Sequence, residues 1–459
     1  MLPAFCGTQL YSKVNWDDEA SLHNWFEDLD LKCVPKQQIG FIGSSMFIGW
    51  ATAALFLPRL SDLYGRRRIF MVSMGLQLVA FFGFFLSRSI ELTTGLMFLF
   101  GMASVGRCSI SFLFLMDLLP TNRQILCGTI LQLFNAGVSL IGTIYFWKIS
   151  KHWQGIEIYA ATLSSIALVG AWVMPESPKY LITMKKYDEA RKAITFIAKV
   201  NGRKEPFTDR FDREVADRIN PIIINQSTFA TYEQLESRGT TVDDHKASVD
   251  ALLQTPKLQI REESQLNGTL KDLVKIKRHF VNLLIFIYVW IASSFNIYML
   301  TYSLKYIPGN IFNNNLMSAI TDIPIAMLGG YVYHRFGVKT ALTGAFTLAV
   351  TGGVLILIFS EANPDFVPYM LSLAKGGIKI TFDICYLANS IIFPTIFAGT
   401  AFGLCNLGAK IATILAPMLA EVDPPVPMIV FSLMAALGGI VSLFIMKSEG
   451  TTMIRGNKS

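Results

Sequence analysis

Apolar stretches with few or no charges recur along this chain and constrain its fold more than any other feature. A helix of about 20 residues crosses the roughly 30 Å of hydrocarbon in a bilayer. Because no water satisfies backbone polar groups there, such stretches must be helical. The sequence therefore predicts an all-α, multi-pass membrane protein. The eleven candidate spans lie at residues 40–60, 69–87, 92–117, 125–147, 155–174, 279–302, 314–333, 340–360, 368–391, 398–420 and 427–446.

The charges between the spans predict the orientation. Lys and Arg accumulate in cytoplasmic loops, so the basic segment 61–68 is expected inside and the acidic segments 361–365 and 421–423 outside. The tail 447–459 then lies inside and the N-terminus outside, and the plasma membrane is the expected location. The same distribution accounts for the net charge of +7 without nucleic-acid binding.

Motifs of enzymes and metal sites are absent from the sequence. The six cysteines include no CxxC pair, so neither a metal site nor a cofactor is expected. No HExxH, P-loop or GxSxG motif stands in a supporting context, so we do not expect an enzyme.

The spans fall into two groups on either side of a polar segment. Five spans occupy residues 39–174 and six occupy residues 279–446. Segment 175–278 is expected to be a cytoplasmic loop with a flexible part, and apolar residues at helical spacing predict a short amphipathic helix over 187–200. Residues 1–38 are expected to form an extracellular segment.

One loop sequence occurs in both halves. Residues 62–67 (DLYGRR) follow the first candidate span, and residues 330–339 (GYVYHRFGVK) follow the seventh. Both resemble the G-x-x-x-D-R-x-G-R-R/K loop signature of the major facilitator superfamily, with Pro58, Leu63 and His334 as departures. The resemblance implies a secondary transporter built from two helical bundles related by pseudo-symmetry.

The resemblance also implies that this loop and its neighbours form a cytoplasmic gate. A glycine allows the loop to turn tightly, and basic residues interact favourably with helix C-termini. The residues assigned to this gate are Asp62, Gly65, Arg66, Arg67, Asp117, Arg123, Glu176, Arg335 and Gly337. In the second half, Ile391 and Ala398 stand where the family has a charge pair, so one pair of the family gate is expected to be missing.

Further segments resemble particular branches of this superfamily. Residues 175–181 (PESPKYL) resemble a signature of sugar porters and organic-ion transporters. Residues 198–202 (AKVNG), 321–324 (TDIP) and 393–395 (FPT) resemble motifs of the organic cation, organic anion and carnitine transporters. This resemblance implies a small organic solute, and it leaves open a proton or another ion as coupling partner.

The start of the chain departs from the family pattern. The basic loop follows the second helix in the family but the first candidate span here. Residues 1–38 resemble the large extracellular loop after the first family helix, in which Cys6 and Cys33 are expected to form a disulfide. We therefore expect the first family helix to be absent, either because the sequence is incomplete or because the chain is an eleven-helix variant.

Ionisable residues inside the candidate spans indicate where a solute binds, because a charge there is costly unless it has a partner or faces water. The six are Arg107, Asp322, Lys375, Lys379, Asp383 and Lys410. Lys375, Lys379 and Asp383 share one helix face. Either at least one of them lines a solute cavity, or Lys379 pairs with Asp383 while Lys375 extends toward the interface. Trp290 and Tyr298 either stack on a solute ring or pack helices together.

Lys410 carries the most information about the solute. The resemblance places it where organic-cation carriers have an acid and where anion and carnitine carriers have a base. The six groups, four bases and two acids, sum to a charge of +2, and a partly desolvated ammonium attracts anions. We therefore expect alternating-access transport of an organic anion or zwitterion. The alternatives are a structural bridge from Lys410 to Asp383 or Asp322, hexose transport, and a transport-inactive relic or sensor.

Overall fold

The described part of the chain is helical. The computed structural model describes residues 14–19, 21–202, 273, 275–393 and 395–446. Among these residues there is no β-strand, only an isolated bridge between His23 and His152, so the all-α prediction is confirmed. Two units are distinguished, the first formed by residues 1–174 with 268–459 and the second by residues 175–267. They are described separately.

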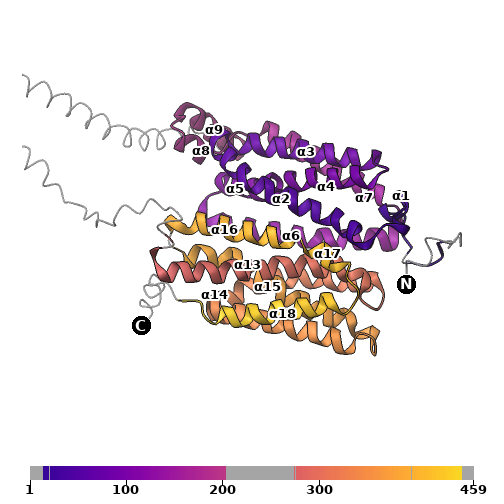
Figure 1. Cartoon of the computed structure of the whole chain (residues 1–459). Coiled ribbons are helices and arrows are strands. Elements are labelled where there is room, and N and C mark those ends of the chain that lie inside the picture. Colours follow the sequence, from indigo (N-terminus) through magenta and orange to yellow (C-terminus); the bar gives the residue numbers. More distant parts are fainter. Residues whose placement is uncertain (1–13, 20, 203–272, 274, 394, 447–459) are drawn as a thin grey trace, which may run out of the picture. The chain divides into compact units, whose positions relative to one another are not determined.

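The N-terminal half of the first unit is a bundle of long helices (Figure 1). Its helices are α1 (Trp25–Asp28), α2 (Lys36–Tyr64), α3 (Arg66–Leu86), α4 (Ile90–Ser104), α5 (Ser111–Leu118), α6 (Thr121–Ile144) and α7 (Trp153–Val173). A π-helical turn, Val105–Ile110, joins α4 to α5 so that they form one rod, and a second, Tyr145–Ile149, extends α6. Helices α2 and α4 approach closely at Gly49, where a Cβ would lie 2.0 Å from the carbonyl oxygen of Phe98.

The segment before α2 packs on the loop between α6 and α7. The indole Nε1 of Trp153 donates a hydrogen bond to Oδ2 of Asp28 at 2.7 Å, and the ring of Trp25 meets the ring of Trp153 edge-on. Cys33 is disulfide-bonded, in agreement with the expected disulfide, whereas Cys6 lies outside the described residues.

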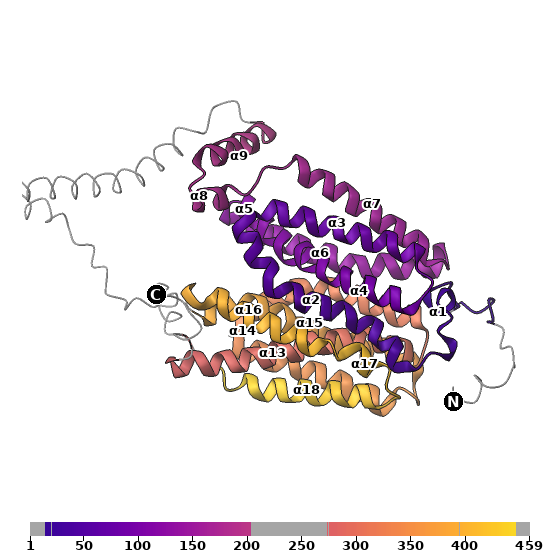
Figure 2. The ribbon, with the colours of Figure 1, turned by 45° about the horizontal axis from the view of Figure 1, so that its top comes forward.

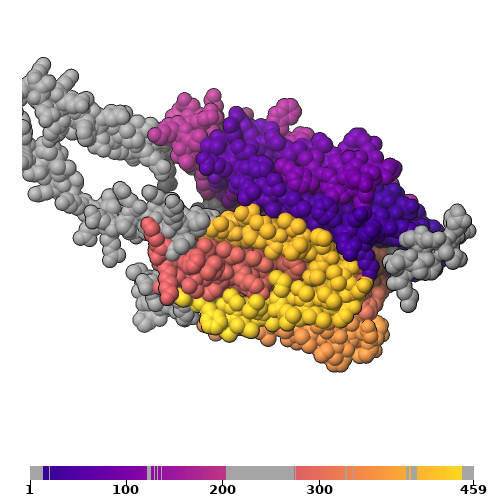
Figure 3. Space-filling model, in the orientation of Figure 1, coloured from indigo at the N-terminus to yellow at the C-terminus, as the bar shows by residue number. Residues whose placement is uncertain are grey.

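The C-terminal half of the first unit is a second helical bundle. Its helices are α13 (Lys277–Ser303), α14 (Ile311–Phe359), α15 (Val367–Ile392), α16 (Thr395–Thr413), α17 (Ala416–Ala420) and α18 (Val426–Ser442). The long α14 consists of two helices that meet at Gly337, whose backbone is not helical. Figure 2 shows α2 of the first half running beside α16 and α17 of the second, and Figure 3 shows the two halves meeting along this line.

The two repeated loops turn at glycines in equivalent places. Gly65 separates α2 from α3 with φ 103°, and Gly337 divides α14 with φ 79°. Both angles lie in the left-handed region, where a side chain is strained and glycine is not. The sequence prediction of a tight glycine turn in each half is therefore confirmed.

Each of the eleven predicted spans overlaps helix in the described residues, although the last, 427–446, is helical only to Ser442 and 398–420 is interrupted between α16 and α17. Eight helices there are long and apolar enough to cross a membrane. Among the rest, α18 is shorter, with 17 residues, and α15 carries Lys375, Lys379 and Asp383.

The second unit contains two short helices in its described part, α8 (Pro178–Thr183) and α9 (Tyr187–Val200). The side chain of Ser177 caps α8 by accepting a hydrogen bond from the backbone N–H of Tyr180 at 3.1 Å. Leu181 of α8 packs against Ala190 and Ala193 of α9. The amphipathic helix predicted over 187–200 is therefore confirmed, with the same bounds.

Candidate functional site: a charged centre between the two bundles

The centre of the first unit holds Lys410 against two aromatic faces. The Nζ atom of Lys410 lies 4.1 Å from the ring centroid of Trp50 on α2 and 5.0 Å from that of Tyr298 on α13. Trp50 is the central residue of α2, about 21 Å from either end at 1.5 Å per residue. Lys410 is 3% exposed. This contact joins the two halves at mid-depth, where transporters built from repeats bind their solutes.

The two carboxylates of the alternative bridge to Lys410 pair with other lysines. Nζ of Lys379 lies 2.8 Å from Asp383 on the same helix, and Nζ of Lys375 lies 2.8 Å from Asp322 on α14. The structural bridge from Lys410 to Asp383 or Asp322 is therefore absent.

Lys375, Lys379 and Asp383 share one face of α15, and the structure corrects one part of the alternative in which they do not line a cavity. Lys379 does pair with Asp383, as that alternative stated, but Lys375 does not extend toward the interface. Its side chain is 12% exposed and that of Asp322 is 11% exposed. Because α14 places a carboxylate within reach, pairing inside the bundle replaces the solvation that the interface would provide.

Among the six ionisable residues inside the spans, Arg107 is the second cation for which the described residues provide no acidic partner. It lies in the π-helical turn between α4 and α5, and its Nη2 donates to Oγ of Ser104 at 3.3 Å. Its guanidinium carbon lies 5.1 Å from the ring centroid of Phe100, and its buried Nε has no hydrogen-bond partner among the described residues. The turn packs against α2, α3, α4 and α5 of its own half.

Four of the six intramembrane charges thus neutralise one another in two pairs, which leaves Lys410 and Arg107 with a charge of +2. Cys108 follows Arg107 in the π-helical turn, and its side chain is exposed, whereas Lys410 is buried.

The aromatic residues predicted to stack on a solute have different environments. Trp290 is 1% exposed, and its ring centroid lies 4.7 Å from that of Tyr386 and 5.3 Å from that of Phe402. Protein rings thus surround it. Tyr298 contacts Lys410 and also meets Phe47 edge-on at 4.7 Å. Of the two, Tyr298 borders the charged centre.

Trp50 and Cys108 are site residues that the sequence analysis missed. Tryptophan is enriched at membrane interfaces, so Trp50 in the middle of a span was a usable signal. Cys108 stands next to Arg107, but its spacing says nothing about access.

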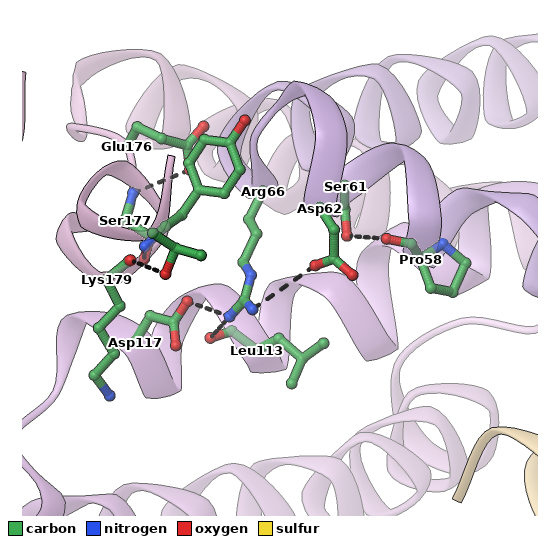
Figure 4. A network of polar contacts seen from close by, with 11 residues as sticks. Pro58, Ser61, Asp62, Arg66, Leu113, Asp117, Glu176, Ser177 and Lys179 are labelled. Carbon is green, nitrogen blue, oxygen red and sulfur yellow. Dashed lines mark hydrogen bonds and ion pairs between the residues drawn. The ribbon is translucent and has the colours of Figure 1, made fainter. Parts of the chain in front are cut away.

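Arg66 is the hub of a polar cluster where α2 and α3 meet, which we call the Gly65 end of the bundle. It forms an ion pair with Asp117 of α5, lies 3.9 Å from Asp62, and donates to the carbonyl oxygen of Leu113 (Figure 4). The side chains of Arg66 and Asp117 are 21% and 14% exposed, whereas that of Asp62 is 69% exposed. The buried partner of Arg66 is therefore Asp117.

Arg67 forms hydrogen bonds with the C-terminus of α7, whereas Arg66 contacts α5. Its Nε donates to the carbonyl oxygen of Ala171 at 2.8 Å, and its Nη2 donates to that of Trp172. A guanidinium at the last carbonyls of a helix satisfies orphan acceptors and complements the helix dipole. The expected capping of a helix C-terminus by this loop is therefore observed at Arg67.

The remaining predicted gate residues lie in three places. Arg123 is exposed in the first turn of α6, and the guanidinium of Arg335 lies 5.8 Å from the ring centroid of Phe336, just before Gly337. Glu176 belongs to the second unit, where its Oε1 accepts a hydrogen bond from the backbone N–H of Ser177 at 3.0 Å.

Comparisons with known proteins agree on the class of this molecule. "Solute carrier family 22 member 3" of Mus musculus is 23% identical over 435 residues, which cover 92% of this chain and 69% of that protein. "Organic cation/carnitine transporter 2" of Homo sapiens is 22% identical over 422 residues, which cover 89% of this chain and 67% of that protein.

Solved structures show the same fold. The proton:xylose symporter XylE bound to 6-bromo-6-deoxy-D-glucose superposes with a TM-score of 0.60 at 14% identity, over 92% of this chain and 91% of that one. The inward-open xylose transporter XylE from E. coli gives a TM-score of 0.58 at 12% identity, over 91% and 88%. These identities support the fold alone. The family model described as the Major Facilitator Superfamily matches residues 20–417, and the chain therefore belongs to that superfamily.

Proposed function

We propose that this chain is a transporter that carries small organic anions or zwitterions across a membrane by alternating access. The supporting observation is Lys410, a buried ammonium between the two bundles that lies over the rings of Trp50 and Tyr298 and has no acidic partner among the described residues. An ammonium has three N–H donors. Those donors are available to a carboxylate or sulfonate of the solute.

The charge at this centre is large enough to select among solutes. Two unit charges 4 Å apart interact by about 4 kcal/mol at an effective dielectric constant near 20, and desolvation removes much of that. A net gain of about 1–2 kcal/mol changes the dissociation constant roughly tenfold. Arg107 adds a second positive charge, whereas the two ion pairs on α15 add none.

Transport of organic cations is the second candidate, because one of the relatives, of Homo sapiens, is named "Organic cation/carnitine transporter 2". A zwitterion such as carnitine fits both lines of support, since its carboxylate suits Lys410 and aromatic rings attract quaternary ammonium groups. Hexose transport is supported by the fold of XylE and by residues 175–181, which resemble a signature that sugar porters share with organic-ion transporters. The relic or sensor alternative predicts no uptake of any solute.

The polar cluster at the Gly65 end is proposed as the cytoplasmic gate, and residues 61–68 supply the basic charge that favours this orientation. Arg66 with Asp117 and Arg67 with α7 hold the ends of α3, α5 and α7 together. Residence in the plasma membrane and coupling to a proton or another ion are parts of the same proposal.

The test is uptake by the purified full chain in liposomes. The probes are a labelled aromatic monocarboxylate, labelled carnitine and a labelled quaternary ammonium without an acid. We expect Lys410→Asp to reduce uptake of the monocarboxylate about tenfold or more and to increase uptake of the quaternary ammonium. Lys192→Asp, at an exposed lysine of α9, is the charge-matched control. Preference of the unmutated chain for the acid-free cation would refute the proposal.

A further inference from the structure

An ion pair joins the two halves at the end of the bundle opposite the Arg66 cluster. Nζ of Lys36, the first residue of α2, pairs with Oδ1 of Asp423 in the segment between α17 and α18. The two residues are 387 positions apart in the chain. Because α2 has 29 residues, Lys36 and the Gly65 turn are separated by about 43 Å at 1.5 Å per residue. The charged centre around Trp50 lies midway between them.

The second half holds its side of this contact in place through Glu421. This carboxylate is 7% exposed and accepts hydrogen bonds from Nζ of Lys305 and from the hydroxyl of Tyr306, both at 2.5 Å. Both donors belong to the turn that ends α13. The segment that presents Asp423 is thereby attached to its own bundle and moves with it.

Below the ion pair, α2 and α17 touch without a gap for a solute. A Cβ added to Gly43 would lie 2.8 Å from Cβ of Pro417, and one added to Gly40 would lie 3.0 Å from Cα of Met418. Oγ of Ser44 donates to the carbonyl oxygen of Ile414 at 2.6 Å. Small residues thus let the two helices seal this end between Lys36 and the charged centre.

We propose that Lys36, Asp423 and the contact of α2 with α17 form a latch that closes the end of the transporter opposite the Gly65 loop and must open once in every transport cycle. This inference rests on the proposed function, since a latch has a role only in a chain that alternates between two openings.

The chemistry of the latch suits a contact that opens repeatedly. The side chains of Lys36 and Asp423 are 40% and 83% exposed. Exposed ion pairs contribute little stability, because water solvates the separated charges well. The glycine contact of α2 also meets the buried Glu421, whose Cγ would lie 3.1 Å from a Cβ added to Gly40. Its partners Lys305 and Tyr306 belong to the same half as Glu421, so separation of the halves leaves this carboxylate paired.

The experiment is a reversible crosslink in the full chain. In Lys36→Cys/Asp423→Cys, mild oxidation should form a disulfide and reduce solute uptake at least tenfold, and a reductant should restore uptake. Each single-cysteine variant should keep its uptake on oxidation. The unmutated chain, treated with the same reductant, controls for reduction of the native disulfide at Cys33.

Two results would overturn the latch. One is a disulfide that forms quantitatively while uptake continues, and the other is the absence of any disulfide although both cysteines are present. A chain that takes up no solute before mutation would instead refute the proposed function. Crosslinking would still report on the contact in that case, because disulfide formation does not depend on transport.

Discussion

Asp322 and Lys375 form an ion pair whose two ends can be removed separately or together. Asp322→Asn keeps the shape of the side chain but leaves Lys375 charged without its partner. Lys375→Met with Asp322→Asn removes both charges. The two side chains are 11% and 12% exposed and 2.8 Å apart, so the pair is close to fully desolvated.

These numbers set the expected size of the effect. Breaking a buried pair from one side costs about 3–5 kcal/mol, whereas replacing both partners by uncharged residues of similar volume is often close to neutral. We therefore expect Asp322→Asn to destabilise the chain by about 3 kcal/mol. The double variant should regain most of this loss, because coupling between contacting residues makes their effects non-additive.

The assay is the apparent unfolding midpoint of the purified full chain in detergent, followed by tryptophan fluorescence. The matched control is Lys379→Met with Asp383→Asn, a second buried pair of the same type. The double variants should also keep the solute preference of the unmutated chain, since Lys410 and Arg107 are untouched. A neutral Asp322→Asn variant, or a double variant whose loss equals the sum of both single losses, would refute this reasoning.

Two further predictions concern the ends of the bundle. Asp117→Asn should reduce uptake more than Asp62→Asn at matched surface expression, because Asp117 is the buried partner of Arg66 and Asp62 lies 3.9 Å away and is exposed; equal uptake of the two variants would contradict this. The hydrogen bond and charge of Lys36 lower the pKa of Asp423 below its usual 3.8, so the pairing is present above that value and is lost only as pH falls through the lowered pKa. The ratio of uptake by Asp423→Asn to uptake by the unmutated chain should therefore stay constant between pH 5 and 8, and a ratio that approaches one at pH 5 would show that Asp423 becomes protonated there.

The fold was predictable because its signals are local. Long apolar runs specify membrane helices, and the amphipathic spacing of residues 187–200 specified α9 with its observed bounds. The two loop repeats predicted the glycine turns at Gly65 and Gly337, since left-handed backbone demands glycine.

The charged centre was only partly predictable because its contacts are non-local. Residue spacing indicated the Lys379–Asp383 pair, which lies within one helix, as one of two alternatives. The Lys375–Asp322 pair joins residues 53 positions apart, and no spacing rule connects them. The contact of Lys410 with Trp50 likewise depends on how the two halves pack.

The central claim is that Lys410 and Arg107 give the region between the halves a positive charge that a solute meets. Cys108, next to Arg107 in the chain, is an exposed native thiol that can report that charge, whereas Cys385 and Cys405 are buried and Cys33 is disulfide-bonded. Cys127 is a second free and partly exposed thiol, so every variant carries Cys127→Ser. The measurement compares the rates at which an anionic and a cationic methanethiosulfonate of similar size modify Cys108 in the purified full chain, with Cys108→Ser as the blank. We predict that the anionic reagent reacts faster and that Lys410→Met lowers the anionic-to-cationic rate ratio about tenfold, equivalent to about 1.4 kcal/mol. A faster cationic reagent, or a ratio unchanged by Lys410→Met, would contradict the account.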